Sequence, residues 1–426
     1  MSKKILLILL AVLCAGSPSL AQTQSDDVVR ITTNLVQIDA VVTKNRRPVK
    51  DLKAEDFEIY EDGKLQTITS FAYVSIVGTN ADATSGTTSG TDSTKPSNPN
   101  NPADPNAPPP IPTEVPRRRI AFVVDDYGLS NQSMTAVRRQ LRKFIDERLK
   151  PHDLIAIIRT SRARRELPQF TNDKSRLNQA WEELKFNQCS RVGVKPMARV
   201  GAENAAGCGS GIASFDESIN SLRAIVNAMG QAPGRKSMII LSDDTPLRED
   251  ERFMRGGSVL QAAEDARPED AHTYTARLRR LAELAIRSSV VIYGVDTGGL
   301  QPTGITAADE TVRPLTSGSI GNAVVVKQLR DQSKLLQSRR DGADAIAKQT
   351  GGFLVHNQNE FQFEQILEDQ SGYYLIGYRP STETFDKRFH KFRARVKKSG
   401  YEVRTRAGFF GMSEEEAKRL KQSTQK

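Results

Sequence analysis

Two short apolar segments of this chain each end in acidic residues. Residues 120–124 run into Asp125 and Asp126, and residues 238–241 run into a second acidic segment that contains Asp243. Apolar runs of this length are typical of strands that are buried on both faces of a parallel sheet. Side chains that follow neighbouring parallel strands meet at the carboxyl edge of the sheet, where open α/β folds bind their ligands. The pattern therefore predicts an acidic ligand-binding edge.

The region of residues 117–369 alternates apolar segments with amphipathic ones, which is typical of a domain built around a parallel sheet. After the first strand, Met134, Val137 and Leu141 share one helical stripe, and Ser130 stands where an N-cap residue is expected. We predict an α/β domain with a doubly wound, mostly parallel sheet. The expected strands are residues 120–124, 154–158, 238–241, 290–295 and 353–355, and further helices are expected near residues 174–184, 215–229, 273–287 and 335–348.

The segments on either side of this domain have the sequence pattern of β-strands. In residues 22–75, every second residue from 36 to 42 is apolar, and the Asp62-Gly63 dipeptide indicates a hairpin turn. Residues 370–411 return to the same β pattern. Because neither segment has enough strands for a stable sheet of its own, we predict that the two pair in one small β-sandwich. The α/β domain would be inserted in this sandwich or attached to it.

Two segments are expected to lie outside the folded domains. Residues 76–116 consist almost entirely of Gly, Ser, Thr, Asn, Asp, Ala and Pro, so they have too little apolar surface to form a core. This composition predicts a disordered linker. Residues 412–426 are rich in charged residues and are expected to form a charged tail.

The N-terminus has the features of a secretory signal peptide. Two lysines precede an apolar stretch of residues 5–15, and Ser19 and Ala21 provide the small residues of a cleavage site. We therefore expect residues 1–21 to be removed and the mature protein to be exported to the periplasm or out of the cell. No later segment is apolar for long enough to span a bilayer, so no transmembrane segment is expected in the mature chain.

The chain is basic, with a formal net charge of +10, of which the signal peptide carries two charges. The excess is scattered over predicted helix faces, for example at Arg138, Arg139 and Arg142, and is not interleaved with aromatic residues. Nucleic-acid sites on single strands combine both features, so a nucleic-acid partner is not expected. A protein or an anionic component of the envelope is the expected ligand.

The cysteines and histidines offer little evidence for a metal or redox centre. Cys189 and Cys208 are the two cysteines that remain after the signal peptide, and an even pair in an oxidising compartment predicts one disulfide. The four histidines, at positions 152, 272, 356 and 390, have no short-range ligand spacing. Each is expected at the surface or in a turn.

Several segments resemble the von Willebrand factor type A (VWFA) family, and more specifically its secreted bacterial VWFA-related proteins. The resemblance covers nearly the whole mature chain except the linker, and it implies a type A α/β fold. RRRIAFVVDDYGLS (residues 117–130), GRKSMIILSDD (234–244) and AIRSSVVIYGVDTGGL (285–300) resemble the first strand with its metal loop, the fourth strand, and the helix and strand that follow. DFEIYEDGKLQTITSF (56–71), AKQTGGFLV (347–355) and YYLIGYRP (373–380) are similar to the bacterial subgroup.

The resemblance implies a metal-ion-dependent adhesion site at the acidic edge. In the family this site has Asp-x-Ser-x-Ser after the first strand, a Thr from a second loop and an Asp after the fourth strand. A hard cation such as Mg²⁺ is held by few protein oxygens and keeps one position for a carboxylate of the partner.

This chain departs from that motif. Counting from Asp126 gives Gly128 and Ser130 at the two serine positions, whereas counting from Asp125 gives Tyr127 and Leu129. Asp243 matches the acid of the fourth strand, and the Thr has no clear match. The candidate metal ligands are Asp125, Asp126, Ser130 and Asp243. Two interpretations remain open: a bound divalent cation, or a vestigial site in which loop groups satisfy the acids and Ser130 is only a helix cap.

These observations lead to an expected function and one alternative. We expect an exported, non-enzymatic module for protein binding, adhesion or scaffolding that uses a VWFA-like domain with a degenerate adhesion site. The alternative is an exported metal-dependent hydrolase that uses the same acids as metal ligands. The hydrolase would need a nucleophile or a general base beside the acids, and the sequence assigns no histidine to that position.

Overall fold

The structure is a computed structural model that describes both β regions and most of the α/β region. Described are residues 35–75, 118–163, 169–192, 211–232, 235–245, 268–299, 340–356, 363–380 and 388–411, together with residues 330 and 337. The predicted signal peptide (1–21), the predicted linker (76–116) and the predicted tail (412–426) lie outside the described residues.

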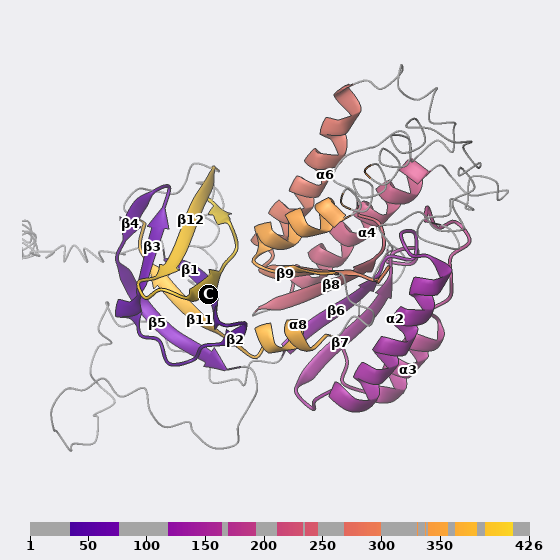
Figure 1. Ribbon diagram of the computed structural model, residues 1–426, viewed down its shortest axis with the longest axis horizontal. Helices are drawn as coiled ribbons and strands as arrows, with labels where there is room; N and C mark the ends of the chain where they lie inside the picture. The colour runs from indigo at the N-terminus through magenta and orange to yellow at the C-terminus, as the bar shows by residue number, and fades with distance from the viewer. Residues whose placement is uncertain are drawn as a thin grey trace, which may run out of the picture. The chain divides into compact units, whose positions relative to one another are not determined.

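Five parallel strands form the sheet of the α/β region (Figure 1). Their spatial order is β10-β9-β8-β6-β7, so β6 has the second strand of the region on one side and the third on the other. The predicted α/β class and the predicted parallel sheet are confirmed. The strands are β6 (Arg118–Val124), β7 (Asp153–Arg159), β8 (Lys236–Ser242), β9 (Val290–Asp296) and β10 (Leu354–Val355).

Strand β6 begins earlier in the sequence than the apolar segment from which it was predicted. It starts at Arg118, and β7 starts at Asp153, which lies opposite Arg118 in register. The Arg118 guanidinium donates hydrogen bonds of 2.8 and 2.6 Å to the two carboxylate oxygens of Asp153, and both side chains are buried. Because each charge satisfies the other, charged residues can continue a buried strand here.

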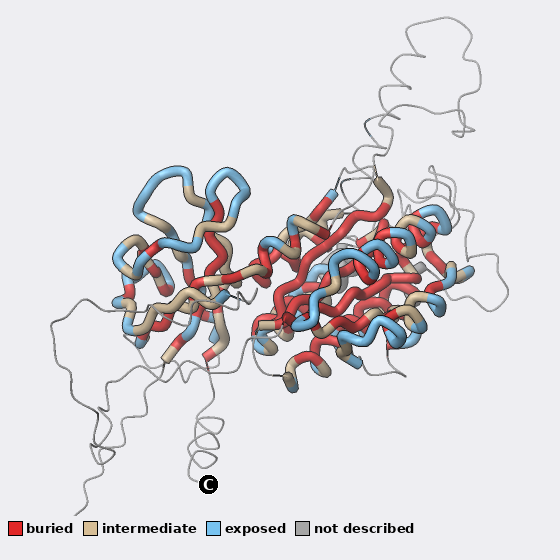
Figure 2. Tube along the Cα trace, turned by 90° about the horizontal axis from the view of Figure 1, so that it is seen from below, coloured by how far each residue is buried: buried red, intermediate tan, exposed pale blue. Residues whose placement is uncertain are grey.

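Helices cover both faces of the sheet because alternate strand residues point to opposite sides. In β6, Phe122 packs on the face that carries α2, whereas Val123 packs on the face that carries α4. Strands β8 and β9 are buried at every position (Figure 2). Among the described helices, none is both long and apolar enough to cross a membrane. One face carries α2 (Asn131–Lys143) with a π-helical extension (Phe144–Arg148), α3 (Lys174–Glu182) and α8 (Glu364–Asp369), and the other carries α4 (Gly211–Gly230) and α6 (Pro268–Arg287).

Two antiparallel sheets contain strands from before and after the α/β region. One sheet has the order β13-β1-β11-β5, with β2 paired to β1, and the other has the order β14-β12-β3-β4. The strands that precede the α/β region are β1 (Val36–Lys44), β2 (Arg47–Pro48), β3 (Phe57–Glu61), β4 (Lys64–Gln66) and β5 (Ile68–Ser75), with a 3-10 turn at Ala54–Asp56. The strands that follow it are β11 (Gly372–Tyr378), β12 (Phe389–Val396), β13 (Tyr401–Arg404) and β14 (Gly408–Phe410).

Strands from the two ends of the chain pair directly with each other. The first half of β1 pairs with β11 and its second half with β13, while β3 pairs with β12. The buried residues of both sheets form one hydrophobic cluster, which includes Ile38, Ala40, Ile59, Tyr374, Ile376 and Phe392. Neither β region therefore supplies a complete sheet or a complete core, and the two together form a sandwich.

The turn between β3 and β4 has the geometry that the Asp62-Gly63 dipeptide predicts. Both residues have positive φ, 47° for Asp62 and 83° for Gly63. Two consecutive positive φ values match the right-handed twist of the flanking strands in a two-residue hairpin. The turn directs Asp62 toward β12, because the Asp62 amide donates a 2.8 Å hydrogen bond to the carbonyl of Lys391.

Candidate functional site

The two acid-ended strands, β6 and β8, are neighbours in the sheet. Val124 and Leu241 lie opposite each other in register, so the segments that follow them leave the same edge side by side. The chain passes from β6 to β7 on one side and then reaches β8 on the other side of β6. Such a reversal is where parallel α/β sheets leave a crevice for ligands. We refer to the segments that follow β6, β7 and β8 as the carboxyl edge.

Asp125 is buried at the carboxyl edge and is fully surrounded by donors. Its Oδ1 atom accepts hydrogen bonds from Thr160 Oγ1 at 3.1 Å and from Ser218 Oγ at 2.6 Å. Its Oδ2 atom accepts from Ser242 Oγ at 2.8 Å and from the Arg191 guanidinium at 2.8 Å. Four side chains from four different segments thus hold this carboxylate.

Arg191 provides the positive charge at the centre of this arrangement. Its side chain is only 3% exposed, and it forms ion pairs with Asp125 at 2.8 Å and with Asp244 at 3.1 Å. The Arg191 amide donates a 2.8 Å hydrogen bond to the carbonyl of Tyr127, and the guanidinium lies 5.5 Å from the ring centroid of Phe215. Burial alone would lower the pKa of Arg191, but the two carboxylates outweigh it and the pKa is raised.

Asp126 is neutralised separately, by the arginine that ends β7. Arg159 donates to Asp126 Oδ2 through Nε at 3.0 Å and through a terminal nitrogen at 2.7 Å. The Ser161 amide donates to Oδ1 at 2.9 Å, and Ser161 Oγ donates to Oδ2 at 2.6 Å. The Thr160 hydroxyl lies 2.9 Å from Oδ1, and its single hydrogen is shared between Asp126 and Asp125. The Asp126 side chain is completely buried, so this network replaces all of its contact with water.

Asp243 and Ser130 form a third group at the carboxyl edge. Asp243 Oδ2 accepts a 3.0 Å hydrogen bond from the Ser130 amide, and Oδ1 accepts from the Thr297 hydroxyl. Ser130 Oγ accepts a 3.2 Å hydrogen bond from the Ser133 amide and so caps α2, as the sequence predicts. Among the described side chains no cation pairs with Asp243, and burial raises the pKa of Asp243 to about 6 although the hydrogen bonds oppose this shift.

Asp125 and Asp126 do not fit a divalent cation at the carboxyl edge. Each is already paired with a guanidinium group, at 2.8 Å for Asp125 and 2.7 Å for Asp126, and each of their oxygens also accepts a hydrogen bond from a protein group. A metal ion bound to either carboxylate would lie next to this positive charge and be repelled by it. The charge that such a cation would supply comes instead from Arg191 and Arg159.

The absence of a side chain at Gly128 leaves room for the guanidinium of Arg191. A Cβ atom at Gly128 would lie 2.4 Å from a guanidinium nitrogen of Arg191 and 2.2 Å from Asp125 Oδ2. Gly128 stands where the adhesion-site motif, counted from Asp126, has its first serine. A serine at this position and the arginine in its present place are therefore incompatible, and the chain contains the pair that fits.

Sequence reasoning identified the acids but not their partners. The carboxyl end of β7 did carry a signal, since Arg159 and Thr160 follow a predicted strand of the same sheet and so reach the same edge. Arg191 carried no such signal, because it lies in an irregular segment 66 residues after Asp125. Ser218 lies within α4, and from the sequence its polar side chain only interrupts the apolar face of that helix.

Cys189 lies two residues before Arg191 and is disulfide-bonded. The predicted partner, Cys208, lies outside the described residues. A disulfide at Cys189 reduces the number of conformations that this part of the chain can adopt when unfolded, which stabilises the folded state.

The protonation of Asp243 should make the stability of the protein depend on pH. Because the pKa of about 6 in the folded state exceeds the value of about 3.9 expected when unfolded, protonation stabilises the folded state below about pH 4. This contribution is lost as the pH rises through 6. Asp243→Asn should therefore raise the free energy of unfolding by about 2–3 kcal/mol at pH 8 and have little effect at pH 4, as measured by urea unfolding.

Asn can replace the protonated acid because its carbonyl can accept from Ser130 and its amide can donate to Thr297. The exposed Asp51→Asn is a matched control, with no expected change at either pH. An Asp243→Asn effect of equal size at pH 4 and pH 8 would show that Asp243 does not titrate in this way.

Comparisons with known proteins give no family for the chain. No protein-family model matches the sequence, and no curated protein matches it at a significant level. The resemblance to the type A family therefore rests on the segments quoted above, and membership of that family stays a prediction.

Proposed function

We propose that this chain is an exported, non-enzymatic binding protein whose α/β region is a type A domain with a degenerate adhesion site. The strand order β10-β9-β8-β6-β7 and the helices on both faces support a doubly wound domain. The segments that resemble the VWFA family include β6, β8 and β9. Adhesion or scaffolding is proposed on the strength of that resemblance, which is an argument by analogy of fold.

One observation carries the proposal: Asp125, Asp126 and Asp244 at the carboxyl edge are neutralised by arginine. The buried Arg191 joins Asp125 to Asp244, and Arg159 pairs with Asp126. A partner would therefore bind the surface of the edge loops themselves, without a cation between its carboxylate and the protein. This corresponds to a scaffold or assembly module that does not depend on metal.

The hydrolase alternative receives no support from this geometry. A metal-dependent hydrolase at the edge would use a cation to activate water, or a histidine to activate a hydroxyl. None of the described side chains that hydrogen-bond to Asp125, Asp126 or Asp243 is a histidine. The hydroxyls of Ser218 and Ser242 instead donate to Asp125.

Export is proposed from the predicted signal peptide, and the disulfide at Cys189 supports it. Disulfides persist in the periplasm and outside the cell and are rare in the reducing cytosol. The expected ligand is a protein or an anionic envelope component.

Affinity capture from the native envelope, with and without a chelator, tests the proposed function. We expect the same partner to be captured in both conditions and to be lost with Tyr127→Ala, which changes a partly exposed loop side chain at the edge. Lys64→Ala, an exposed change on β4, is the control and should retain the partner. Capture that requires Mg²⁺, or that is unaffected by Tyr127→Ala, would contradict metal-free binding at this edge.

A further inference from the structure

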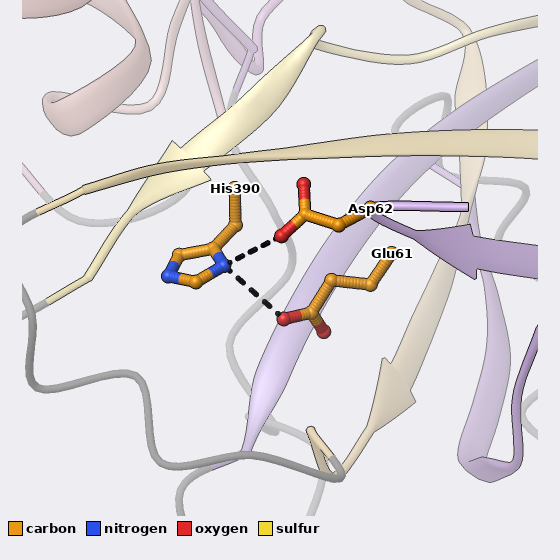
Figure 3. Close-up of side chains that lie close together, drawn as sticks. All are labelled: Glu61, Asp62 and His390. Carbon is orange, nitrogen blue, oxygen red and sulfur yellow. Dashed lines mark hydrogen bonds and ion pairs between the residues drawn. The ribbon is translucent and has the colours of Figure 1, made fainter. Parts of the chain in front are cut away.

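The β-sandwich contains a cluster of one histidine and two acids (Figure 3). His390 Nδ1 lies 3.0 Å from Asp62 Oδ2 and 3.5 Å from Glu61 Oε1, and one ligand atom from each residue lies within 4.8 Å of the others. The prediction that His390 lies at the surface or in a turn is wrong, because it lies in β12 and is only 8% exposed. Asp62 and His390 are 328 residues apart in the sequence, which is why spacing gave no sign of the cluster.

The backbone of the sandwich fixes these three side chains in place. Glu61 ends β3 and lies opposite Phe392 of β12 in register. The Lys391 amide donates a 2.9 Å hydrogen bond to Asp62 Oδ1, which leaves Oδ2 directed at His390 (Figure 3). The imidazole stacks on the ring of Phe409 with centroids 5.1 Å apart and an interplanar angle of 20°. The cluster is thus preorganised on two paired strands and their turn.

One buried oxygen of the cluster has unused hydrogen-bonding capacity. Glu61 is only 4% exposed, and its Oε2 atom has no hydrogen-bond partner among the described residues. The Tyr378 hydroxyl lies near this carboxylate but also lacks a partner of normal hydrogen-bond geometry among the described residues. An unsatisfied buried carboxylate oxygen is costly, so an additional group at this place would stabilise the folded protein.

We propose that Glu61, Asp62 and His390 bind a divalent first-row metal ion of the Zn²⁺ type. Bonds of about 2.0–2.2 Å from such an ion place neighbouring donor atoms about 3.0–3.4 Å apart, depending on whether six or four ligands surround it. The distances of 3.0 and 3.5 Å from His390 Nδ1 to the two carboxylates are close to this range. The ion binds neutral imidazole at Nδ1 and two carboxylates, whose charges it balances.

The donor set and its exposure define which ions fit. One imidazole nitrogen with two carboxylate oxygens favours Zn²⁺ over Mn²⁺, and both over Mg²⁺ or Ca²⁺, which prefer oxygen ligands alone. The Asp62 side chain is 50% exposed, so the ion can enter from that side and complete its coordination with water. Three protein ligands and an accessible remaining position are also sufficient for an external ligand to bind.

Zn²⁺ titration of the full chain, without a polyhistidine tag or reductant, tests the proposal by calorimetry. We expect one Zn²⁺ per chain, weaker Mn²⁺ binding and no Mg²⁺ binding at this site. His390→Gln and Asp62→Asn should each weaken Zn²⁺ binding at least 10-fold. The matched controls are His152→Gln and Asp51→Asn, which change exposed residues and should leave Zn²⁺ affinity unchanged.

The alternative arrangement is a protonated imidazole held between the two acids without an ion. Asp62 is half exposed, so Asp62→Asn is expected to fold, and circular dichroism of every variant without metal checks this directly. The absence of Zn²⁺ binding by the folded wild-type chain would overturn the proposal. Zn²⁺ binding that is equally strong in Asp62→Asn and His390→Gln would overturn it as well, because the ion would then bind elsewhere.

Discussion

Replacement of Arg191 by leucine is expected to lower the free energy of unfolding by about 3–5 kcal/mol. The guanidinium is 3% exposed and pairs with Asp125, which is 4% exposed, and with Asp244. Leucine would leave the charge of Asp125 buried without a cation, since its remaining partners are hydroxyl groups. Urea unfolding at neutral pH measures the change.

Two further variants show whether this loss reflects the buried charge. Arg162→Leu removes an arginine that is 47% exposed and pairs with Glu183, so it should cost no more than about 1 kcal/mol. Asp125→Asn should recover part of the loss in the Arg191→Leu background, because it removes the unpaired charge. An Arg191→Leu variant as stable as Arg162→Leu would show that the carboxyl edge does not depend on this ion pair.

The second large effect is expected in the core of the parallel sheet. Phe122→Ala should lower the free energy of unfolding by about 3–5 kcal/mol, because it removes a completely buried ring from β6, an interior strand of the sheet. The ring of Phe122 lies 4.9 Å from the ring of Phe144 and 4.9 Å from that of Phe363, measured between centroids. The space between the sheet and its helices would collapse only in part, which leaves a cavity.

Thermal and urea unfolding of Phe122→Ala can be compared with Leu65→Ala, a change at a leucine that is 63% exposed. The Leu65 variant should differ from the wild type by less than about 0.5 kcal/mol. If the two variants were equally stable, the ring of Phe122 would not be part of the core.

The parallel sheet could be predicted because its strands are buried on both faces. β8 and β9 are buried at every position, so their sequences are nearly continuous apolar runs between polar segments. The pairing of the two β regions could be predicted for a different reason, because neither region has enough strands to form a stable sheet alone. The short β14 was not predicted, because Gly408–Phe410 has too few residues for a visible alternation.

At the carboxyl edge, the acids could be predicted from the sequence but their partners could not. Asp125 and Asp243 were identified because parallel strands bring their ends together, which follows from topology alone. The neutralisation of Asp125 by Arg191 depends on the path of an irregular segment, and no periodicity describes such a path. The same limit applies to His390 and Asp62, which meet only because β12 pairs with β3. Long-range pairing of this kind is a property of the fold, not of local sequence.

Arginine side chains, and not a metal ion, neutralise Asp125 and Asp126 at the carboxyl edge. The most direct test is Mg²⁺ titration of the wild-type chain, followed by calorimetry and by thermal unfolding with millimolar Mg²⁺ or with chelator. We expect no heat of binding at this edge and no change in Tm, because the guanidinium groups that pair with Asp125 and Asp126 would repel a metal ion there. Stoichiometric Mg²⁺ binding that persists in His390→Gln and disappears in Asp125→Asn would contradict it.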